Sequence, residues 1–405
     1  MHAAASSGLR VAAAVSLLVL ASAARGPAAP APRTATPVHV PRVDSRLLDW
    51  LAPGGQGTVA GFAGSFQRVR LETTDGRPLA WTRFGRLGRF RVTFRAPNPG
   101  RYGLRVVAGA ARAPAGVLTV RAVVLDAVGD ITFAEQVGPA LASHGAAYPW
   151  LRVAGLLRSA DVTVGNLETS VSARGTAQVK EYTFRGPPQA LRPMAELAGF
   201  DALTLANNHS GDFGAEALLD TVRHVHAAGI EPFGAGVDVA AARRPAVVEA
   251  GGLKIAFLGY SDVNPAGFNA TASTPGTAKA DASSITADVR AARRRGAVVV
   301  CFMHWGVEKE AQPGVRQQQL AAACLNAGAR VVLGAHPHVL GRVSRPERRS
   351  VVAWTLGNFV FPSVGASART AILQLHLAAD GVRGFRLLPV TIDGFRPEPF
   401  TRTRR

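Results

Sequence analysis

The sequence predicts an α/β domain over residues 122–398, preceded by a small all-β sandwich over residues 56–121. Two observations predict this order. Between Val59 and Val120, apolar and polar residues alternate in short runs that are separated by turn-forming residues, which is typical of antiparallel strands with one buried face. From Ala122 onward, continuous apolar runs alternate with helical stretches, which indicates buried strands connected by helices.

The first 24 residues resemble a secretory signal peptide. Arg10 precedes an apolar stretch, VAAAVSLLVLASAA, and the small residues at its end provide cleavage sites. That stretch is short for a membrane span, and no later stretch is long and apolar enough to cross a bilayer. Residues 25–55 begin with a segment rich in Pro, Ala and Arg and are expected to be a linker. We therefore expect a secreted, extracytoplasmic protein, soluble or loosely associated with the cell surface, with no transmembrane segment in the mature chain.

Four alternating segments predict the strands of the sandwich. They are FQRVRLET, RFRVTFRA, RYGLRVVA and GVLTVRAV, and the turn-forming segments between them include Asp75-Gly76 and Asn98-Pro99-Gly100. Short, regularly spaced strands of this kind predict an immunoglobulin-like sandwich. No residue in it has a catalytic pattern. It could bind a polymer or act as a spacer, but an adaptor without a ligand is the simpler interpretation.

The α/β pattern rests on six strands that read as buried and on helices between several of them. The strands are AVVLDAVG, DVTVGN, DALTLAN, KIAFLGYS, AVVVCFMH and RVVLGAH, and two of the helices are GAEALLDTVRHVHAAG and GVRQQQLAAACLNAG. After residue 350, three strands follow one another without helices, which suggests a second, more antiparallel sheet. The two cysteines, Cys301 and Cys324, fall in a strand and a helix. Burial as free thiols is the expected state, with a disulfide as the alternative in an oxidising compartment.

The formal net charge is +19, and most of the basic residues are arginines. Such a charge attracts polyanions through its field. We exclude nucleic acid as the expected partner, because no nucleic-acid-binding module is recognisable and the arginines are dispersed. An exported protein meets other polyanions, including teichoic acids, capsules and acidic polypeptides. A bias of base composition toward arginine is the alternative explanation of the charge.

Polar residues that could bind a metal or transfer a proton follow the ends of the predicted strands. In open α/β sheets ligands bind at the carboxyl ends of strands, so segments far apart in sequence can converge there. Each residue alone has a simpler interpretation: Asp130 could cap a helix, Glu168 could be a solvated loop residue, and His304 could be a core histidine. Their recurrence at successive strand ends favours a shared metal centre. The residues are Asp130, Asn166, Glu168, Asn207, Asn208, His209, Asp212, His304, Glu308, His336, His338 and Asn358.

The segment VVLGAHPHV carries two of these residues, His336 and His338, on either side of Pro337. Residues two apart in extended backbone project to the same side, and a proline disfavours helical geometry in the residue before it. We therefore expect an extended backbone from which both imidazoles point together, as a metal site requires. A pair of surface histidines on a turn is the alternative.

These motifs resemble the capsule-synthesis protein CapA family, which is linked to poly-γ-glutamate. The segments AVGDIT, ADVTVGNLETS, LANNHSGDFG, MHWGVE, GAHPHV and TLGNFVF occur in the order found in that family, over roughly residues 122–395. The family's domain resembles calcineurin-like metallophosphoesterases. The resemblance therefore implies a four-layer α/β/β/α sandwich with metal held at one edge of two sheets.

The resemblance also implies a role for each strand-end residue. The metal ligands would be Asp130, Glu168, Asn208, His304, His336 and His338, with Glu168 as the bridging carboxylate. His209 would act as general acid or base, and Glu168 would also orient the water. Such a mixed set of oxygen and nitrogen ligands suits Mn, Fe or Zn better than Ca. The expected supporting residues are Asn166, Asn207, Asp212, Glu308 and Asn358.

One departure from the metallophosphoesterase pattern concerns Thr132. Those enzymes usually carry a histidine two residues after the first aspartate, and this chain has a threonine there. One of the two metal positions is therefore a ligand short, and the site is expected to hold either one ion or a second one weakly. The resemblance makes His338 a ligand of the depleted position and His336 a ligand of the fuller one.

Three functions are compatible with these observations. The leading hypothesis is a metal-dependent hydrolase or transferase that acts on an anionic cell-surface polymer in poly-γ-glutamate or capsule metabolism. The second is a non-catalytic factor that binds or assembles such a polymer with its basic surface. The third is an exported metallophosphoesterase, against which the missing histidine counts. A fold alone does not decide among them.

Overall fold

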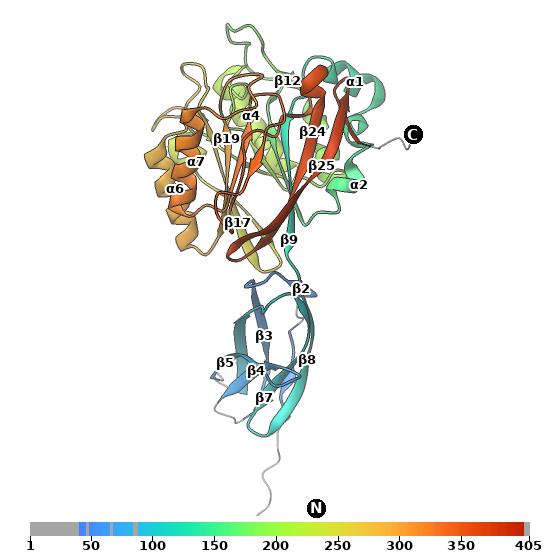
Figure 1. Cartoon of the computed structure of the whole chain (residues 1–405), viewed down its shortest axis with the longest axis vertical. Coiled ribbons are helices and arrows are strands. Elements are labelled where there is room, and N and C mark those ends of the chain that lie inside the picture. Colours follow the sequence, from blue (N-terminus) through green and yellow to red (C-terminus); the bar gives the residue numbers. More distant parts are fainter. Residues whose placement is uncertain (1–39, 46–47, 65–67, 84–87, 401–405) are drawn as a thin grey trace, which may run out of the picture. The chain divides into compact units, whose positions relative to one another are not determined.

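The computed structural model describes residues 40–45, 48–64, 68–83 and 88–400 (Figure 1). The expected signal peptide and most of the Pro/Ala-rich segment lie outside these ranges. In the part of the chain that the structure describes, no helix is long and apolar enough to cross a membrane.

The N-terminal strands form two sheets around one apolar core. Residues of both sheets, among them Val59, Phe94, Leu71 and Leu118, belong to this core. The first sheet has the order β1 (Arg42–Val43), β3 (Gln56–Phe62), β6 (Arg89–Arg95). The second has the order β2 (Trp50–Leu51), β8 (Ala111–Val120), β7 (Gly100–Ala108), β4 (Val69–Thr73), β5 (Pro78–Thr82).

Strands β1 and β2 lie within residues 25–55, the segment that we expect to be a linker. Leu51 of β2 is fully buried, so this part of the chain packs as the sandwich does. Two-residue strands are too short to show an alternating pattern, which is why the sequence did not reveal them.

The remaining chain forms two large sheets. The eight-stranded sheet has the order β14 (Glu231–Phe233), β13 (Ala202–Thr204), β10 (Val162–Leu167), β9 (Val123–Ile131), β24 (Arg369–Ala378), β25 (Gly381–Asp393), β26 (Arg396–Pro399), and β23 (Asn358–Val360) also pairs with β9. The six-stranded sheet has the order β16 (Ala246–Ala250), β17 (Leu253–Ser261), β19 (Val298–His304), β20 (Val331–Ala335), β22 (Val351–Ala353), β21 (Val343–Ser344). Two short pairs complete the strands: β11 (Ser170–Val171) with β12 (Arg185–Gly186), and β15 (Ala235–Gly236) with β18 (Gly276–Thr277).

Helices cover the outer faces of both sheets (Figure 1). On the eight-stranded sheet lie α1 (Val137–His144), α2 (Ala154–Leu157), α3 (Leu191–Glu196) and α4 (Gly214–Ala227), with short 3-10 turns at Tyr148–Trp150, Pro188–Ala190 and Gly365–Ala368. On the six-stranded sheet lie α5 (Val239–Ala242), α6 (Ala282–Arg294) and α7 (Val315–Ala327).

Strand β19 shows how the layers are divided. Val298, Val300 and Phe302 belong to the apolar core between the two sheets, whereas Val299, Cys301 and Met303 pack against the helices. This is the two-residue period of a strand buried on both faces. The structure therefore confirms the four-layer α/β/β/α arrangement. Cys301 and Cys324, which both fall in the described part of the chain, are buried free thiols.

The strands after residue 350 are antiparallel in part, as expected, since β24, β25 and β26 pair antiparallel, but they do not form a sheet of their own. Strand β22 pairs in parallel with β20, whereas β24 pairs antiparallel with β9 and extends the eight-stranded sheet. Leu373, Leu375 and Leu377 of β24 lie in the core between the sheets. An apolar pattern reveals that a strand is buried, but not which neighbour it pairs with.

The middle of β9 carries a buried acid, Asp126. Its Oδ1 atom accepts a hydrogen bond of 2.9 Å from Gln374, whose Oε1 atom in turn accepts one of 2.8 Å from Arg386. Its Oδ2 atom is buried and has no partner among the described residues. Burial raises the pKa of Asp126 to about 6, although Gln374 and Arg386 act to lower it.

This pKa predicts how stability depends on pH. Because the pKa is higher in the folded state, the folded protein binds the proton more tightly, and stability falls as pH rises from about 4 to about 6. The difference corresponds to about 3 kcal/mol. Asp126→Asn should therefore raise the melting temperature at pH 7.5 and flatten its decline between pH 4 and 7. The exposed Asp393→Asn variant is the control, and equal pH profiles in both variants would contradict the account.

Candidate metal centre

Segments far apart in sequence bring their polar residues together at the carboxyl ends of the central strands. Asp130 lies at the end of β9, and Glu168 follows β10 directly. His304 ends β19, and His336 and His338 follow β20. The first three side chains are almost fully buried, and each of the last two residues is 7% exposed. The strand-end rule therefore placed these residues near one another correctly.

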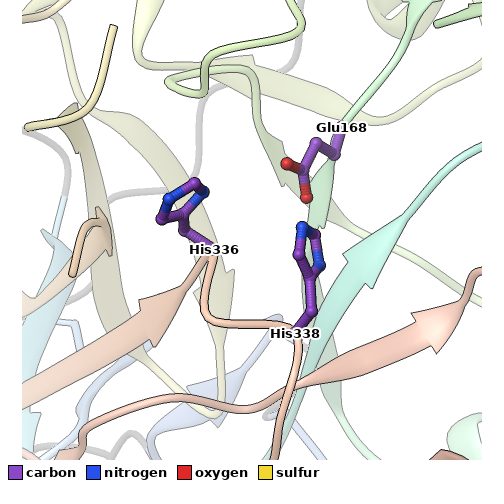
Figure 2. A group of neighbouring side chains, drawn as sticks. All are labelled: Glu168, His336 and His338. Carbon is purple, nitrogen blue, oxygen red and sulfur yellow. The ribbon is translucent and has the colours of Figure 1, made fainter. Parts of the chain in front are cut away.

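Two groups of possible ligand atoms share Glu168. The first consists of Glu168, His336 and His338, and its ligand atoms lie within 4.8 Å of one another. Figure 2 shows the imidazole rings of His336 and His338 near the carboxylate of Glu168. The second group, held together by the same distance limit, consists of Asp130, Glu168 and His304. Within it, His304 Nε2 lies 3.4 Å from Glu168 Oε1.

The backbone at the two histidines is not extended, so that expectation is wrong. His336 has φ 93° and His338 has φ 56°. The backbone N–H of His336 donates to Asp130 Oδ2 at 3.2 Å, and the carbonyl of Pro337 accepts from the N–H of Lys309 at 2.8 Å. These two hydrogen bonds hold a turn. It is this turn, and not an extended backbone, that places both imidazole rings near Glu168.

Backbone strain is concentrated around this site. Among the described residues, only four residues other than glycine have a positive φ, namely Glu135, Lys309, His336 and His338. Glu135 follows β9, Lys309 follows β19, and the two histidines follow β20. Strained conformations of this kind cost about 1–3 kcal/mol each and cluster at functional sites.

Burial and mutual charge shift the pKa values of the acids. Burial alone would raise the pKa of Asp130, but the hydrogen bond and charge of His338 lower it to about 2. Burial, followed by the charge of Asp130, raises the pKa of Glu168 well above its usual range. Two like charges held this close oppose each other's ionisation, so the pair favours the presence of a cation.

The histidines divide into two kinds. Burial, and for His336 also the charges of its neighbours, lowers the pKa of His304 and His336 to about 3, so both rings are neutral near pH 7 and each has a nitrogen lone pair. Burial would also lower the pKa of His338, but the carboxylates of Glu168 and Asp130 raise it to about 9. Without a metal ion, His338 is therefore protonated near pH 7, and its positive charge lies beside the carboxylates of Glu168 and Asp130.

Two buried atoms of the first group have no hydrogen-bond partner in the described structure: Glu168 Oε1 and His336 Nδ1. Buried polar atoms are nearly always paired, so an unpaired carboxylate oxygen and an unpaired imidazole nitrogen in one cluster leave two lone pairs available to a cation. A carboxylate and neutral imidazoles are ligands for divalent metals. The residues present therefore fit a divalent metal ion.

The loop LANNHSGD supplies the next set of residues. Asn208 Oδ1 lies 2.7 Å from His304 Nε2, so this asparagine adjoins the second group. The ring of His209 stacks on Phe184 with centroids 3.9 Å apart, and its Nδ1 atom lies 2.7 Å from Asp212 Oδ2. Burial lowers the pKa of His209, although Asp212 acts to raise it.

Asp212 precedes α4 but does not cap it. The N-cap position is Phe213, and no side chain caps this helix through a hydrogen bond. The carboxylate of Asp212 instead accepts hydrogen bonds of 2.7 Å from Lys180 Nζ and from the backbone N–H of Phe184, beside its contact with His209. Asp212 is fully buried. Its hydrogen bonds connect the LANNHSGD loop to the segment that contains Lys180 and Phe184.

The sequence reasoning missed Lys180 and Phe184. Lys180 Nζ also donates to the carbonyl of Asn208 at 2.8 Å and lies 3.4 Å from His209 Nδ1. Both residues lie on the connection between β11 and β12, which has no hydrophobic period. Lys180 is one of four lysines in the chain, so no sequence signal distinguished this position.

The remaining expected residues are also accounted for. His338 Nδ1 lies 2.8 Å from Asn358 Oδ1, and Asn358 Nδ2 donates to Ser363 at 2.8 Å. Glu308 is exposed and makes no side-chain hydrogen bond among the residues described, but its charge acts on Glu168 and His304. Thr132 is buried, and its hydroxyl accepts from the N–H of Ala134 at 3.2 Å.

Comparison with known proteins gives consistent family matches. The family described as bacterial capsule synthesis protein PGA_cap matches residues 124–363. The PGA biosynthesis protein CapA of Bacillus subtilis (strain 168) is 32% identical over 276 residues, which cover 67% of this chain and 72% of that protein. The capsule biosynthesis protein CapA of Bacillus anthracis is 30% identical over 283 residues, which cover 68% of each.

Two solved structures align with this chain at low identity. A phosphatase of Mycoplasma pneumoniae aligns with TM-score 0.43 and 12% identity, over 67% of this chain and 94% of that one. The NAD nucleotidase of Haemophilus influenzae aligns with TM-score 0.40 and 12% identity, over 69% of this chain and 53% of that one.

The network around Asp212 predicts a large loss of stability on its neutralisation. Asp212→Asn leaves Lys180, whose side chain is 19% exposed, without its carboxylate, and this should cost about 3–5 kcal/mol in urea unfolding. The matched control is Asp262→Asn, which breaks the more exposed pair with Arg316 and should cost about 0–1 kcal/mol. Equal losses in the two variants would show that the network is not structural.

Proposed function

Because the chain belongs to the bacterial capsule synthesis protein family, we propose that it is an exported, metal-dependent hydrolase or transferase acting on an anionic cell-surface polymer. We take the polymer to be of the poly-γ-glutamate class, because the Bacillus subtilis relative is named a PGA biosynthesis protein. The observation that carries the proposal is the buried group of Glu168, His336 and His338 with two unpaired ligand atoms.

The metal would be Mn, Fe or Zn, and its candidate ligands lie in the two groups and at Asn208. When bound, such an ion lowers the pKa of a water molecule and polarises a carbonyl or phosphoryl oxygen. The six candidate ligands are Asp130, Glu168, Asn208, His304, His336 and His338. His336, neutral near pH 7, offers a lone pair without first losing a proton.

His209 is the residue that we assign to proton transfer. Asp212 Oδ2 is a hydrogen-bond acceptor, so the proton of a neutral His209 ring lies on Nδ1 and the Nε2 atom carries the lone pair. The stack on Phe184 holds the plane of the ring. A histidine with a fixed tautomer can accept a proton at Nε2 and return it to a leaving group.

The charge of the chain supports an anionic polymer as the substrate. The sequence has 46 basic and 27 acidic residues, and its net charge of +19 attracts polyanions. The N-terminal apolar stretch supports export, which places the protein where such polymers lie.

Metal binding should depend on the two histidines of the first group. His336→Ala and His338→Ala should each weaken the binding of Mn²⁺ or Zn²⁺ by more than about 100-fold, because even outer partners of a metal site contribute 10- to 100-fold. Titration calorimetry of the purified protein, after removal of metal with a chelator, measures this. His226→Ala on the exposed face of α4 is the matched control. Unchanged affinity in all three variants would refute the metal centre.

Catalysis should appear as metal-dependent shortening or transfer of the polymer. We expect purified protein with Mn²⁺ to change the chain length of poly-γ-glutamate, measured by size-exclusion chromatography, and EDTA to abolish the change. His209→Ala should slow it by about 10²- to 10⁴-fold, because a positioned acid or base contributes that much. Binding that falls with salt but survives EDTA, with no change of length, would instead favour the non-catalytic assembly factor. Turnover of an aryl phosphate alone would favour the phosphoesterase.

A further inference from the structure

We propose that the site holds one metal ion rather than two, because the side-chain amide of Asn166 fills the second group. This inference rests on the metal dependence proposed above. It concerns Asp130, Glu168 and His304, whose ligand atoms lie within 4.8 Å of one another and would otherwise suit a second ion.

The orientation of a neighbouring amide, Asn207, follows from backbone groups whose roles are certain. Its Oδ1 atom lies 3.1 Å from the N–H of His209, which can only donate. Its Nδ2 atom lies 2.8 Å from the carbonyl of Leu167, which can only accept. Oxygen and nitrogen of an amide are otherwise easily exchanged, but these two contacts allow only one assignment.

The orientation of Asn166 then follows from that of Asn207. Asn207 Nδ2 donates at 3.0 Å to the atom of Asn166 that faces it, so that atom is the acceptor Oδ1. The NH₂ group of Asn166 must therefore face the opposite side. It lies 2.8 Å from Asp130 Oδ1, 3.4 Å from Glu168 Oε2 and 3.2 Å from His304 Nδ1.

These three atoms belong to the three members of the second group. The two NH₂ hydrogens carry partial positive charge and face one possible ligand atom of each of these residues. A metal ion among these residues would compete with the amide for the same lone pairs. The ion would also be repelled by the partial positive charge of the NH₂ group. The amide thus already occupies one atom of each member of the second group, and of the Glu168 carboxylate only Oε1 has no hydrogen-bond partner in the described structure. Thr132 has no imidazole to offer, and one lone pair of its hydroxyl is used by the backbone N–H of Ala134.

The first group is open by the same criteria. Glu168 Oε1 and His336 Nδ1 have no hydrogen-bond partner in the described ranges. His338 Nδ1 is bound to Asn358 Oδ1 at 2.8 Å and lies 3.2 Å from Asp130 Oδ2, which leaves its Nε2 atom for a ligand. The single ion therefore belongs with Glu168, His336 and His338.

Metal stoichiometry of the full chain tests the inference. Metal-free protein is dialysed to equilibrium against Mn²⁺, and bound metal is measured by elemental analysis. We expect one ion per chain in the wild type and two in Asn166→Asp, because a carboxylate cannot donate and supplies a further ligand. Asn98→Asp, in an exposed turn of the sandwich, is the matched control and should bind one.

The possible outcomes separate this inference from the proposed function. No bound ion in the wild type would overturn both. Two ions in the wild type would overturn only the single-ion inference, and one ion in Asn166→Asp would overturn the role of Asn166. If that variant does not fold, electron paramagnetic resonance of the Mn²⁺-loaded wild type decides. An uncoupled six-line spectrum supports the inference, and a spectrum of two coupled ions overturns it.

Discussion

The burial of two neighbouring carboxylates, Asp130 and Glu168, is the constraint on which the whole site depends. Both side chains are fully removed from solvent, and a buried charge without a partner costs several kcal/mol. In the metal-free protein the charge of His338 compensates them, and Asn166 donates hydrogen bonds to both. A divalent ion meets the same need more fully, because it can bind the unpaired oxygen of Glu168 and the neutral ring of His336.

The fold positions these groups through close backbone contacts at the edge of the central strands. Gly129 immediately precedes Asp130, and a Cβ atom there would collide with the carbonyl oxygen of Gly357. The absence of a side chain lets β23 lie beside β9, which brings Asn358 to His338. The positive φ values of His336 and His338 belong to the same edge, where strain is maintained by hydrogen bonds to Asp130 and Pro337.

Much of this arrangement could be predicted from the sequence, because buried strands have a clear apolar pattern and ligands gather at strand ends. That rule brought together Asp130, Glu168 and His304 from separate segments. The turn at His336 could not be predicted, because its geometry depends on a hydrogen bond to Asp130, distant in sequence. The same holds for Asp212, whose partners Lys180 and Phe184 come from another loop, and for the pairing of β24, since apolar residues do not specify a neighbour.

Anomalous diffraction from crystals grown with Mn²⁺, recorded near the manganese absorption edge, tests the central claim most directly. The account predicts a peak within coordination distance, roughly 2.0–2.3 Å, of donor atoms of Glu168, His336 and His338. No peak at saturating Mn²⁺, with His338 still beside Asp130, would contradict it. Asp130 would then form a structural ion pair with a protonated His338.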